Sequence, residues 1–300
     1  MIVVFGSVAL DLVTNVARIP NPGESLQCPA YALVPGSKGG NQAVAAARSG
    51  AQVVHIASVG RDAYADLATA TLRAEGVDLS RLNLSERATG LCLVTVADDG
   101  ENTVIVASGA NLDTRVAQLE ALDFGAGDTL MLQMEVTPHD NFAAATLGRQ
   151  RGARVVLNVA PAAPVPAATL AELDVLVVNE HEAMIVAEAV SLAVEGPEDA
   201  ARVLHGAYGC STIVTLGARG ALAWHKGRML EVAAPKIRPV DTTAAGDSFT
   251  GAFAAALDAG EDFASALKRG VVAGALACTI SGAQTSIPRL ADIVAALPQT

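Results

Sequence analysis

The 300-residue chain is 51% apolar and 17% charged, and its 31 acidic and 20 basic side chains give a net charge of −11 at pH 7. This composition indicates a globular chain with a large core, and the negative charge argues against nucleic-acid and anionic-membrane partners. No apolar run approaches the about 18 residues of a membrane-spanning helix. The first residues lack Lys and Arg and include Asp11, unlike a secretory signal, so we expect a cytoplasmic protein.

Strand-like and helix-like segments alternate along most of the chain. Continuous apolar runs are typical of parallel strands buried on both faces. The runs are Ile2–Phe5, Gln52–Ala57, Thr129–Gln133, Arg154–Val159, Val175–Val178 and Thr212–Leu216, and the helical patterns lie near 40–49, 63–75, 138–150, 180–189 and 197–208. This order predicts an α/β fold with a doubly wound, mostly parallel sheet and helices on both faces.

Residues 13–36 and 89–109 interrupt this alternation. Gly90–Val96 and Thr103–Ala107 are β-prone and are joined by Asp98-Asp99-Gly100-Glu101, a strong hairpin signal. We expect the two segments to supply four short antiparallel strands to a small separate sheet. A third hairpin, Ala221–His225 to Arg228–Val232, is expected at an edge of the main sheet.

The loop Gly36-Ser37-Lys38-Gly39-Gly40-Asn41 precedes an alanine-rich helix and lacks the Walker spacing. One interpretation is a flexible turn with a helix cap. The other is a ligand site, in which glycines bring the backbone close to a small polar molecule while Lys38 and Asn41 bind it. Asp11 follows the first strand and would point to the same carboxyl edge, where doubly wound folds bind ligands.

Two further motifs follow predicted strands. Asn179 and Glu182 are three residues apart, so they either form a capping box or help to hold hydrated Mg²⁺ near a triphosphate. The turn Thr215–Gly220 is compatible with a nucleotide-contacting loop or a plain turn.

The segment Asp241–Asp247 carries the sharpest signal. It follows the strand-like Ile237–Val240, and helical spacing begins at about Gly246. Free amides at a helix start favour an anion, and Ala244, Ala245 and Gly246 leave room for one. Asp247 could then act as a general base that deprotonates a hydroxyl, although an acid at a helix start is ordinarily a cap.

The remaining candidate residues show no metal-site spacing. The cysteines Cys28, Cys92, Cys210 and Cys278 form no C-x-x-C pair, so we expect reduced, buried side chains and no zinc site. The five histidines show no ligand spacing and are expected to have no role in a site.

In this order, the motifs resemble the ribokinase branch of the ribokinase-like (PfkB) carbohydrate kinases. The matching segments are Gly6-Ser7 with Asp11, 36–45, Leu132-Gln133-Met134-Glu135, 179–182, 215–217, 241–247 and Gly282-Ala283-Gln284-Thr285-Ser286-Ile287-Pro288. The resemblance implies a kinase domain (1–12, 37–88 and 110–300), a β-sheet lid over the sugar site (13–36 and 89–109), and a homodimer through the lid. It implies transfer of the γ-phosphoryl group of ATP to a primary hydroxyl, D-ribose being the expected acceptor.

The resemblance also implies roles for individual residues. The implied general base is Asp247, with an anion hole at Ala244, Ala245 and Gly246. The implied sugar contacts are Asp11, Lys38, Gly39, Gly40, Asn41, Glu135 and Asp247, and the implied nucleotide contacts are Asn179, Thr215, Gly217, Gly220 and Gly246. Glu182 matches an acid that organises Mg²⁺. A monovalent-cation site, usually for K⁺, matches Asp241, Thr243, Ala277, Ile280, Gly282 and Ser286.

Two positions depart from the ribokinase pattern. Ala9 replaces an asparagine, and Ser37 replaces a glycine. A sugar hydroxyl left without its partner would lose about 1–3 kcal/mol of binding, which is enough to change the preferred sugar. A nucleoside, fructose or 2-keto-3-deoxygluconate kinase is therefore an alternative, as is a non-catalytic sugar- or nucleotide-binding protein.

Overall fold

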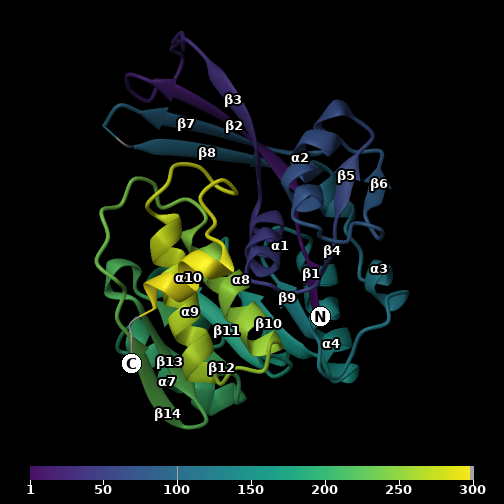
Figure 1. The fold of residues 1–300 in the computed structure, drawn as a ribbon, viewed down its shortest axis with the longest axis vertical. Coiled ribbons are helices and arrows are strands. Elements are labelled where there is room, and N and C mark those ends of the chain that lie inside the picture. Colours follow the sequence, from purple (N-terminus) through teal and green to yellow (C-terminus); the bar gives the residue numbers. More distant parts are fainter. Residues whose placement is uncertain (100, 298–300) are drawn as a thin grey trace.

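A computed structural model describes residues 1–99 and 101–297. The main sheet has the strand order β14-β13-β12-β11-β10-β9-β1-β4, and the strands from β12 to β4 are parallel (Figure 1). These strands are β1 (Ile2–Phe5), β4 (Val53–Ile56), β9 (Thr129–Leu132), β10 (Arg154–Asn158), β11 (Val175–Asn179), β12 (Ser211–Thr215), β13 (Ala221–His225) and β14 (Arg228–Val232). The predicted doubly wound sheet and its edge hairpin are confirmed.

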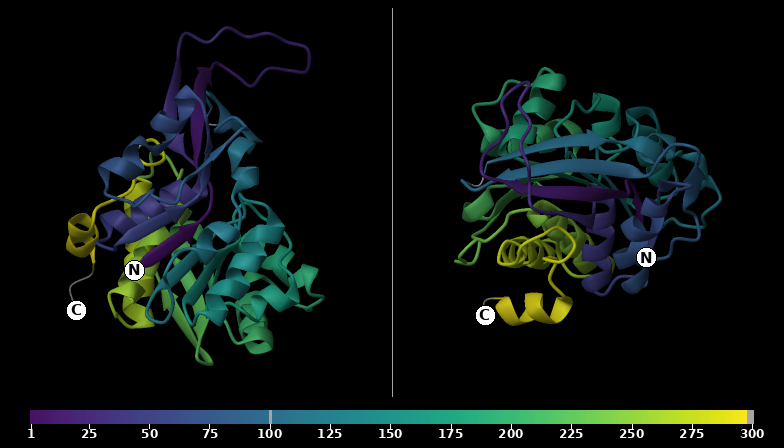
Figure 2. Two further views of the ribbon diagram at one scale, coloured as in Figure 1. Left: turned by 90° about the vertical axis from the view of Figure 1, so that its right-hand side faces the viewer. Right: turned by 90° about the horizontal axis from the view of Figure 1, so that it is seen from above.

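Helices cover both faces of this sheet (Figure 2). They are α1 (Lys38–Arg48), α2 (Ala63–Ala74), α3 (Ala117–Glu120), α4 (Pro138–Gln150), α5 (Ala167–Leu170), α6 (Glu180–Ala189), α7 (Pro197–Tyr208), α8 (Ala245–Asp258), α9 (Phe263–Ala277) and α10 (Leu290–Ala296), with short 3₁₀ turns η1 (Gly109–Asp113) and η2 (Gly217–Arg219). Successive side chains of β1 show why its sequence is continuously apolar. Ile2 and Val4 pack in a cluster with α1, α2, α8 and α9, whereas Val3 and Phe5 pack in a cluster with α4, α6 and α7.

β1 lies at the point where the direction of winding reverses. It pairs in parallel with β4 on one side and with β9 on the other. The loops that follow β1 and β9 therefore diverge from adjacent strand ends and leave a crevice between them, where ligands bind in this type of fold.

The second sheet, which we call the lid, lies beyond the carboxyl ends of the parallel strands (Figure 1). Its order is β3 (Tyr31–Gly36), β2 (Ala9–Val16), β7 (Gly90–Ala97) and β8 (Asn102–Ala107). The predicted hairpin is confirmed by the antiparallel β7–β8 register, although Gly100 of its turn lies outside the described residues. The expectation of antiparallel strands throughout was wrong, because β2 and β7 both leave the main domain in the same direction and pair in parallel.

Other elements differ from the sequence prediction. Ile237–Val240 forms no strand, since Pro235 and Pro239 remove two of the N–H donors that a sheet ladder needs. The short parallel pair β5 (Ser58–Gly60) and β6 (Asn83–Ser85) was not foreseen, nor were α3, α5, α9 and α10. Among residues 1–99 and 101–297, none of the helices has the length and apolar character required to span a bilayer.

Candidate active site

The start of α1 is docked against the segment that follows β1. Ser37 is the N-cap; its hydroxyl accepts a hydrogen bond from the N–H of Gly40 (3.2 Å) and donates one to the carbonyl oxygen of Ser7 (3.0 Å). The N–H of Gly39 donates to Oγ of Ser7 (3.1 Å). A Cβ on Gly39 would overlap the Ser7 nitrogen and lie 2.7 Å from the Ser7 oxygen, so this close approach requires glycine. The expected cap therefore exists, and it brings α1 to the crevice.

Ser37 occupies backbone space that ordinarily requires glycine. Its φ of 77° and ψ of 147° are disfavoured for a residue with a side chain, at a cost of about 1–3 kcal/mol. The two hydrogen bonds of its hydroxyl offset part of that strain. This is how a serine is accommodated where the ribokinase pattern has glycine.

Glu135 accepts hydrogen bonds from the segments that follow β1 and β3. It follows β9, and its Oε2 accepts hydrogen bonds from the Ser7 hydroxyl (2.5 Å) and the N–H of Lys38 (2.8 Å). Burial raises the pKa of Glu135, although the Ser7 bond and the Lys38 charge oppose the shift. Burial alone would lower the pKa of Lys38, but Asp247, Glu135 and Glu182 raise it above its ordinary value. The negative charges of these three carboxylates therefore favour the protonated form of Lys38.

Asp247 lies in the first turn of α8 and is only 6% exposed. Its Oδ2 accepts from Nδ2 of Asn41 (2.9 Å), and its Oδ1 accepts from Nε2 of Gln42 (3.0 Å). Two successive residues of α1 therefore hold the two oxygens of one buried carboxylate. No other hydrogen bond to either oxygen is formed by the residues that the structure describes, so each oxygen keeps a lone pair for a further donor.

The turn before Asp247 presents backbone amides. Ala244 has a left-handed φ of 59°, and its carbonyl accepts from the N–H of Ser248 (2.8 Å). The N–H of Ala245 donates to the carbonyl of Thr242 (3.2 Å), whereas those of Ala244 and Gly246 have no partner among the described residues. A Cβ added to Gly246 would meet no described atom within 4 Å, so the approach to these amides is open.

Asp11 is carried by the lid strand β2 rather than by a loop. Gly36 of β3 faces it so closely that a Cβ there would overlap the Asp11 carboxylate. Burial raises the pKa of Asp11 to about 6; a hydrogen bond with Cys92 lowers it, and the charges of Glu135 and Asp247 raise it further. Asp11, Lys38, Glu135 and Asp247 therefore act on one another electrostatically, as residues of one site do.

The raised pKa of Asp11 predicts a pH-dependent cost to folding. A carboxyl whose pKa is about 6 when folded and 3.8 when unfolded lowers stability as pH rises through that interval, and the full penalty persists above pH 6. We expect Asp11→Asn to raise the melting temperature at pH 8, and the gain to vanish below about pH 4. Calorimetry at pH 4, 6 and 8 checks this; an equal gain at all three pH values would contradict it.

The predicted nucleotide residues lie at neighbouring strand ends. Asn179 and Thr215 are register partners at the ends of β11 and β12. Asn179 and Glu182 form a capping box, with bonds of 2.7 and 2.8 Å, and burial raises the pKa of Glu182. Gly220 has a φ of 103°, and a Cβ there would overlap the carbonyl oxygen of Val232, so glycine is required by packing alone.

The predicted cation residues lie on two adjoining loops. Oδ1 of Asp241 accepts from the N–H of Thr243 (2.9 Å), and its Oδ2 accepts from the N–H of Gly282 (2.8 Å). A further hydrogen bond, from the N–H of Val240 to the carbonyl of Cys278 (2.8 Å), holds this loop against the C-terminus of α9. Ala277 and Ser286 are buried, whereas Ile280 is 54% exposed. The loop that leads to the α8 N-terminus is therefore fastened to the segment after α9.

The expectation that all four cysteines are buried was wrong for two of them. Cys28 is exposed and Cys278 half-buried, while Cys92 and Cys210 are buried as expected. His55, which was expected to have no role, is fully buried behind the site, where its Nε2 lies 3.2 Å from the Ser7 oxygen. Burial lowers the pKa of His55 to about 4. The hydrogen bonds of Ser7 and Gln42 around the site were not foreseen, although both residues lie within motifs that the sequence analysis quoted.

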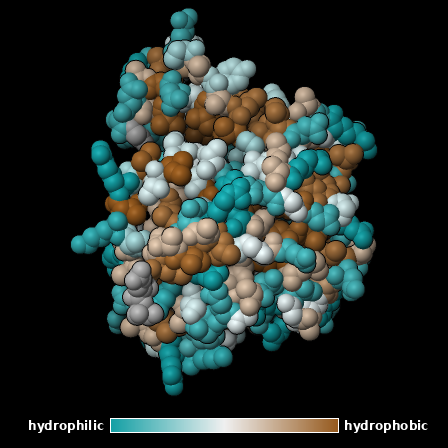
Figure 3. All heavy atoms as spheres, viewed as in Figure 1, coloured by the Kyte–Doolittle hydropathy of each residue, from teal (hydrophilic) through white to brown (hydrophobic). Residues whose placement is uncertain are grey.

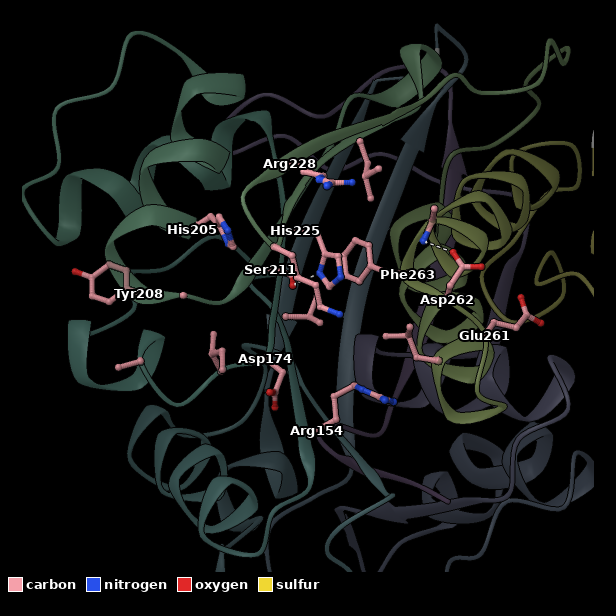
Figure 4. A pocket seen from close by; sticks show the side chains of 18 of the residues that line it. Arg154, Asp174, His205, Tyr208, Ser211, His225, Arg228, Glu261, Asp262 and Phe263 are labelled. Carbon is pink, nitrogen blue, oxygen red and sulfur yellow. Dashed lines mark hydrogen bonds between the residues drawn. The ribbon is translucent and has the colours of Figure 1, made fainter.

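A cavity lies at the amino ends of the strands of the main sheet, the end opposite the site (Figure 4). It measures about 970 Å³ and is lined by residues at the amino ends of strands, such as Arg154, Val175 and Ser211. His225 stacks on Phe263 there, with ring centroids 4.0 Å apart. None of the predicted site residues lines this cavity, so it is separate from the predicted active site. Within the described part of the chain, no cluster of three or more His, Cys, Asp or Glu could hold a metal ion.

The geometry agrees with comparisons to known proteins. The family model of the pfkB family carbohydrate kinases matches residues 1–290. The chain belongs to this family. A ribokinase from Haemophilus influenzae is 35% identical over 95% of this chain and 94% of its own length, and a deoxyribokinase from Salmonella typhi is 31% identical over 96% of each. A ribokinase of Arabidopsis thaliana, solved with ribose and ATP, superposes with a TM-score of 0.87 at 26% identity, covering 100% of this chain and 99% of that one. The ribokinase-like fold of this pfkB family kinase is thereby confirmed.

Proposed function

We propose that this pfkB family kinase transfers the γ-phosphoryl group of ATP to the primary hydroxyl of D-ribose. The observation that carries the proposal is the buried Asp247 carboxylate, held by two amides of α1 beside the open N-terminus of α8. The charge of Asp247 acts on Asp11, Lys38 and Glu135, as expected of residues in one polar sugar site. Ribokinases among its relatives, one of them solved with ribose and ATP, support the choice of substrates.

Two neighbouring groups carry out the chemistry: a carboxylate removes the hydroxyl proton, and backbone amides stabilise the charge on the phosphoryl group. Asp247 accepts the proton of the attacking hydroxyl through a lone pair that Asn41 and Gln42 leave open. The free amides of Ala244 and Gly246 stabilise negative charge on the phosphoryl group in transfer. Phosphoryl transfer needs mainly positioning and electrostatics, which suits a site built from backbone amides in an acidic protein.

The donor set at Glu182 is compatible with hydrated Mg²⁺. Oε2 of Glu182 is engaged with the N–H of Asn179, while Oε1 makes no hydrogen bond within residues 1–99 and 101–297. Mg²⁺ prefers oxygen ligands and retains water, so a single carboxylate can hold it through water molecules. When bound, the ion neutralises charge on the phosphates of ATP. Asn179, Thr215, Gly217 and Gly220 are the proposed nucleotide contacts.

A second candidate acceptor is 2-deoxy-D-ribose. Ala9, which replaces the asparagine of the ribokinase pattern, is 3% exposed and offers no side-chain group to a sugar hydroxyl. A sugar that lacks one hydroxyl loses nothing at such a position. The deoxyribokinase relative supports this alternative.

A substrate panel tests the function. ADP release is measured with ribose, 2-deoxyribose, fructose, 2-keto-3-deoxygluconate and nucleosides at one ATP concentration. We expect the highest kcat/KM with ribose; a higher value with 2-deoxyribose would assign the second function. Absence of acceptor-dependent ADP release with all of them would refute the kinase and favour a non-catalytic binding protein.

We propose a K⁺ site between the loops that Asp241 fastens together. Its oxygen donors would come from Asp241, Thr243, Ala277, Ile280, Gly282 and Ser286, mostly through backbone carbonyls. Because this loop leads directly into the amides at Ala244 and Gly246, an ion there would order the anion hole. We expect initial rates to be higher in KCl than in NaCl or choline chloride; equal rates in the three salts would contradict the site.

The exposed lid supports a homodimer. All residues of the edge strand β8 are exposed, including Val104, Ile105 and Val106 at 51–60%. Figure 3 shows hydrophobic surface over this sheet. An unpaired apolar edge is suited to pairing with a second copy of the chain. We place the enzyme in the cytoplasm, where ATP is available.

A further inference from the structure

A chain of buried side-chain amides reaches Asp247 from behind the site. Nε2 of Gln133 donates to Oε1 of Gln42 (2.9 Å), and Nε2 of Gln42 donates to Oδ1 of both Asp247 and Asn158 (3.0 Å each). Nδ2 of Asn141 in turn donates to the carbonyl of Gln133 (2.8 Å). Gln42, Gln133 and Asn141 are fully buried. The chain thus links α4, the residue after β9, β10 and α1 to the carboxylate.

The charge of Asp247 fixes the direction of the bonds made by Gln42. An ionised carboxylate can only accept, so Gln42 must turn its N–H groups towards Asp247. Its Oε1 then faces Gln133, which supplies the N–H that this oxygen requires. If the amide of Gln42 were rotated by half a turn, its N–H groups would face the N–H of Gln133. Its oxygen would then face the oxygens of Asp247 and Asn158. Gln42 therefore has one stable orientation.

Asn41 lacks this constraint. Its Nδ2 also donates to Asp247, but its Oδ1 has no partner among the described residues. In the described structure, no second hydrogen bond fixes the orientation of the Asn41 amide. The two donors to the carboxylate thus differ: Gln42 is also held by Asn158 and Gln133, whereas the Asn41 side chain is held by Asp247 alone among the described residues.

We propose that Gln42 is a positioning residue for the reaction, which fixes Oδ1 of Asp247 so that the free lone pairs point to the sugar hydroxyl. The proposal rests on the proposed function of Asp247 as the base. Gly6 contributes indirectly, because a Cβ there would overlap Oε1 of Gln133 and displace the residue that orients Gln42.

Gln42→Met tests the proposal, because methionine keeps the length of the side chain and removes its hydrogen bonds. We expect kcat to fall about 10²-fold, as when a reacting group is misplaced, with both KM values within about threefold of wild type. Gln118→Met is the matched control. Gln118 also makes three hydrogen bonds, to Ala57, Arg81 and Arg115, but it lies on α3. The control should lose stability without losing kcat.

A double-mutant cycle separates positioning from general destabilisation. In an Asp247→Asn background there is no base to orient, so Gln42→Met should reduce the residual rate, measured with radiolabelled ATP, by less than about threefold. An unchanged kcat in the single variant, or an equal loss in both backgrounds, would overturn the proposal.

A crystal structure of Gln42→Met supplies a readout that needs no activity. We expect the Asp247 carboxylate to rotate from its wild-type position, and an unmoved carboxylate would also overturn the proposal. If instead the wild-type enzyme phosphorylates no acceptor, the proposed function fails. That outcome does not depend on where the Asp247 carboxylate lies in the Gln42→Met crystal structure.

Discussion

Replacing Asp247 by asparagine is expected to lower kcat by about 10²–10⁴-fold, the usual contribution of a general base. The fold should survive the change. Asn41 can turn its amide to accept from the side-chain N–H group introduced at position 247, because its Oδ1 has no other partner in the described structure. Affinities for sugar and ATP should change little, since the proposed sugar contacts of Asp11, Lys38 and Glu135 are unaltered. Initial rates and isothermal titration calorimetry measure the two effects separately.

Asp258→Asn provides the control for that experiment. Asp258 ends the same helix, and its carboxylate pairs with the N-terminal ammonium group (3.1 Å) at the opposite end of α8 from the site. The control should therefore retain wild-type kcat. A kcat near the wild-type value in Asp247→Asn itself would remove the assignment of this residue as the base.

Gly39→Ala is expected to have the second largest effect. The added methyl group would overlap the Ser7 nitrogen and lie 2.7 Å from the Ser7 oxygen, and backbone atoms cannot rotate away. The start of α1 must then move, together with Lys38, Asn41 and Gln42. We expect kcat/KM to fall at least about 10²-fold and stability to fall by about 1–3 kcal/mol.

Gly206→Ala is the matched variant. Gly206 lies within α7, and a Cβ there meets no described atom within 4 Å. Alanine should stabilise this helix by about 0.5–1 kcal/mol and leave activity unchanged. Thermal unfolding and initial rates compare the two variants. Wild-type activity and stability in Gly39→Ala would show that α1 is not docked as described.

Much of the fold could be predicted because parallel strands buried on both faces require continuous apolar runs. Val175–Val178 and Thr212–Leu216 were placed to within one residue of β11 and β12. The failure at Ile237–Val240 has a local cause, since Pro235 before it and Pro239 within it lack the N–H groups that a strand pairs. The parallel β2–β7 pair depends on how two distant segments leave the main sheet, which no local pattern encodes.

The site was only partly predictable. Asp11, Asn41 and Asp247 stand in motifs with a chemical rationale of their own. Gln42 has no such signal, because a glutamine in an alanine-rich helix is typical of a solvent-facing position. Its burial follows from the packing of α8 over α1, where a Cβ on Gly251 would lie 2.8 Å from the Gln42 carbonyl oxygen. Ser37 was visible as a departure from a pattern, but its positive φ was not.

A crystal structure of the enzyme with ribose and a non-hydrolysable ATP analogue tests the central claim most directly. We expect the primary hydroxyl of the sugar to lie about 2.6–3.2 Å from a carboxylate oxygen of Asp247, with other hydroxyls bound by Asp11 and Asn41. The γ-phosphoryl group should face the amides of Ala244 and Gly246. A sugar bound with no hydroxyl within reach of Asp247, or bound instead at the amino edge beside His225 and Phe263, would contradict the account.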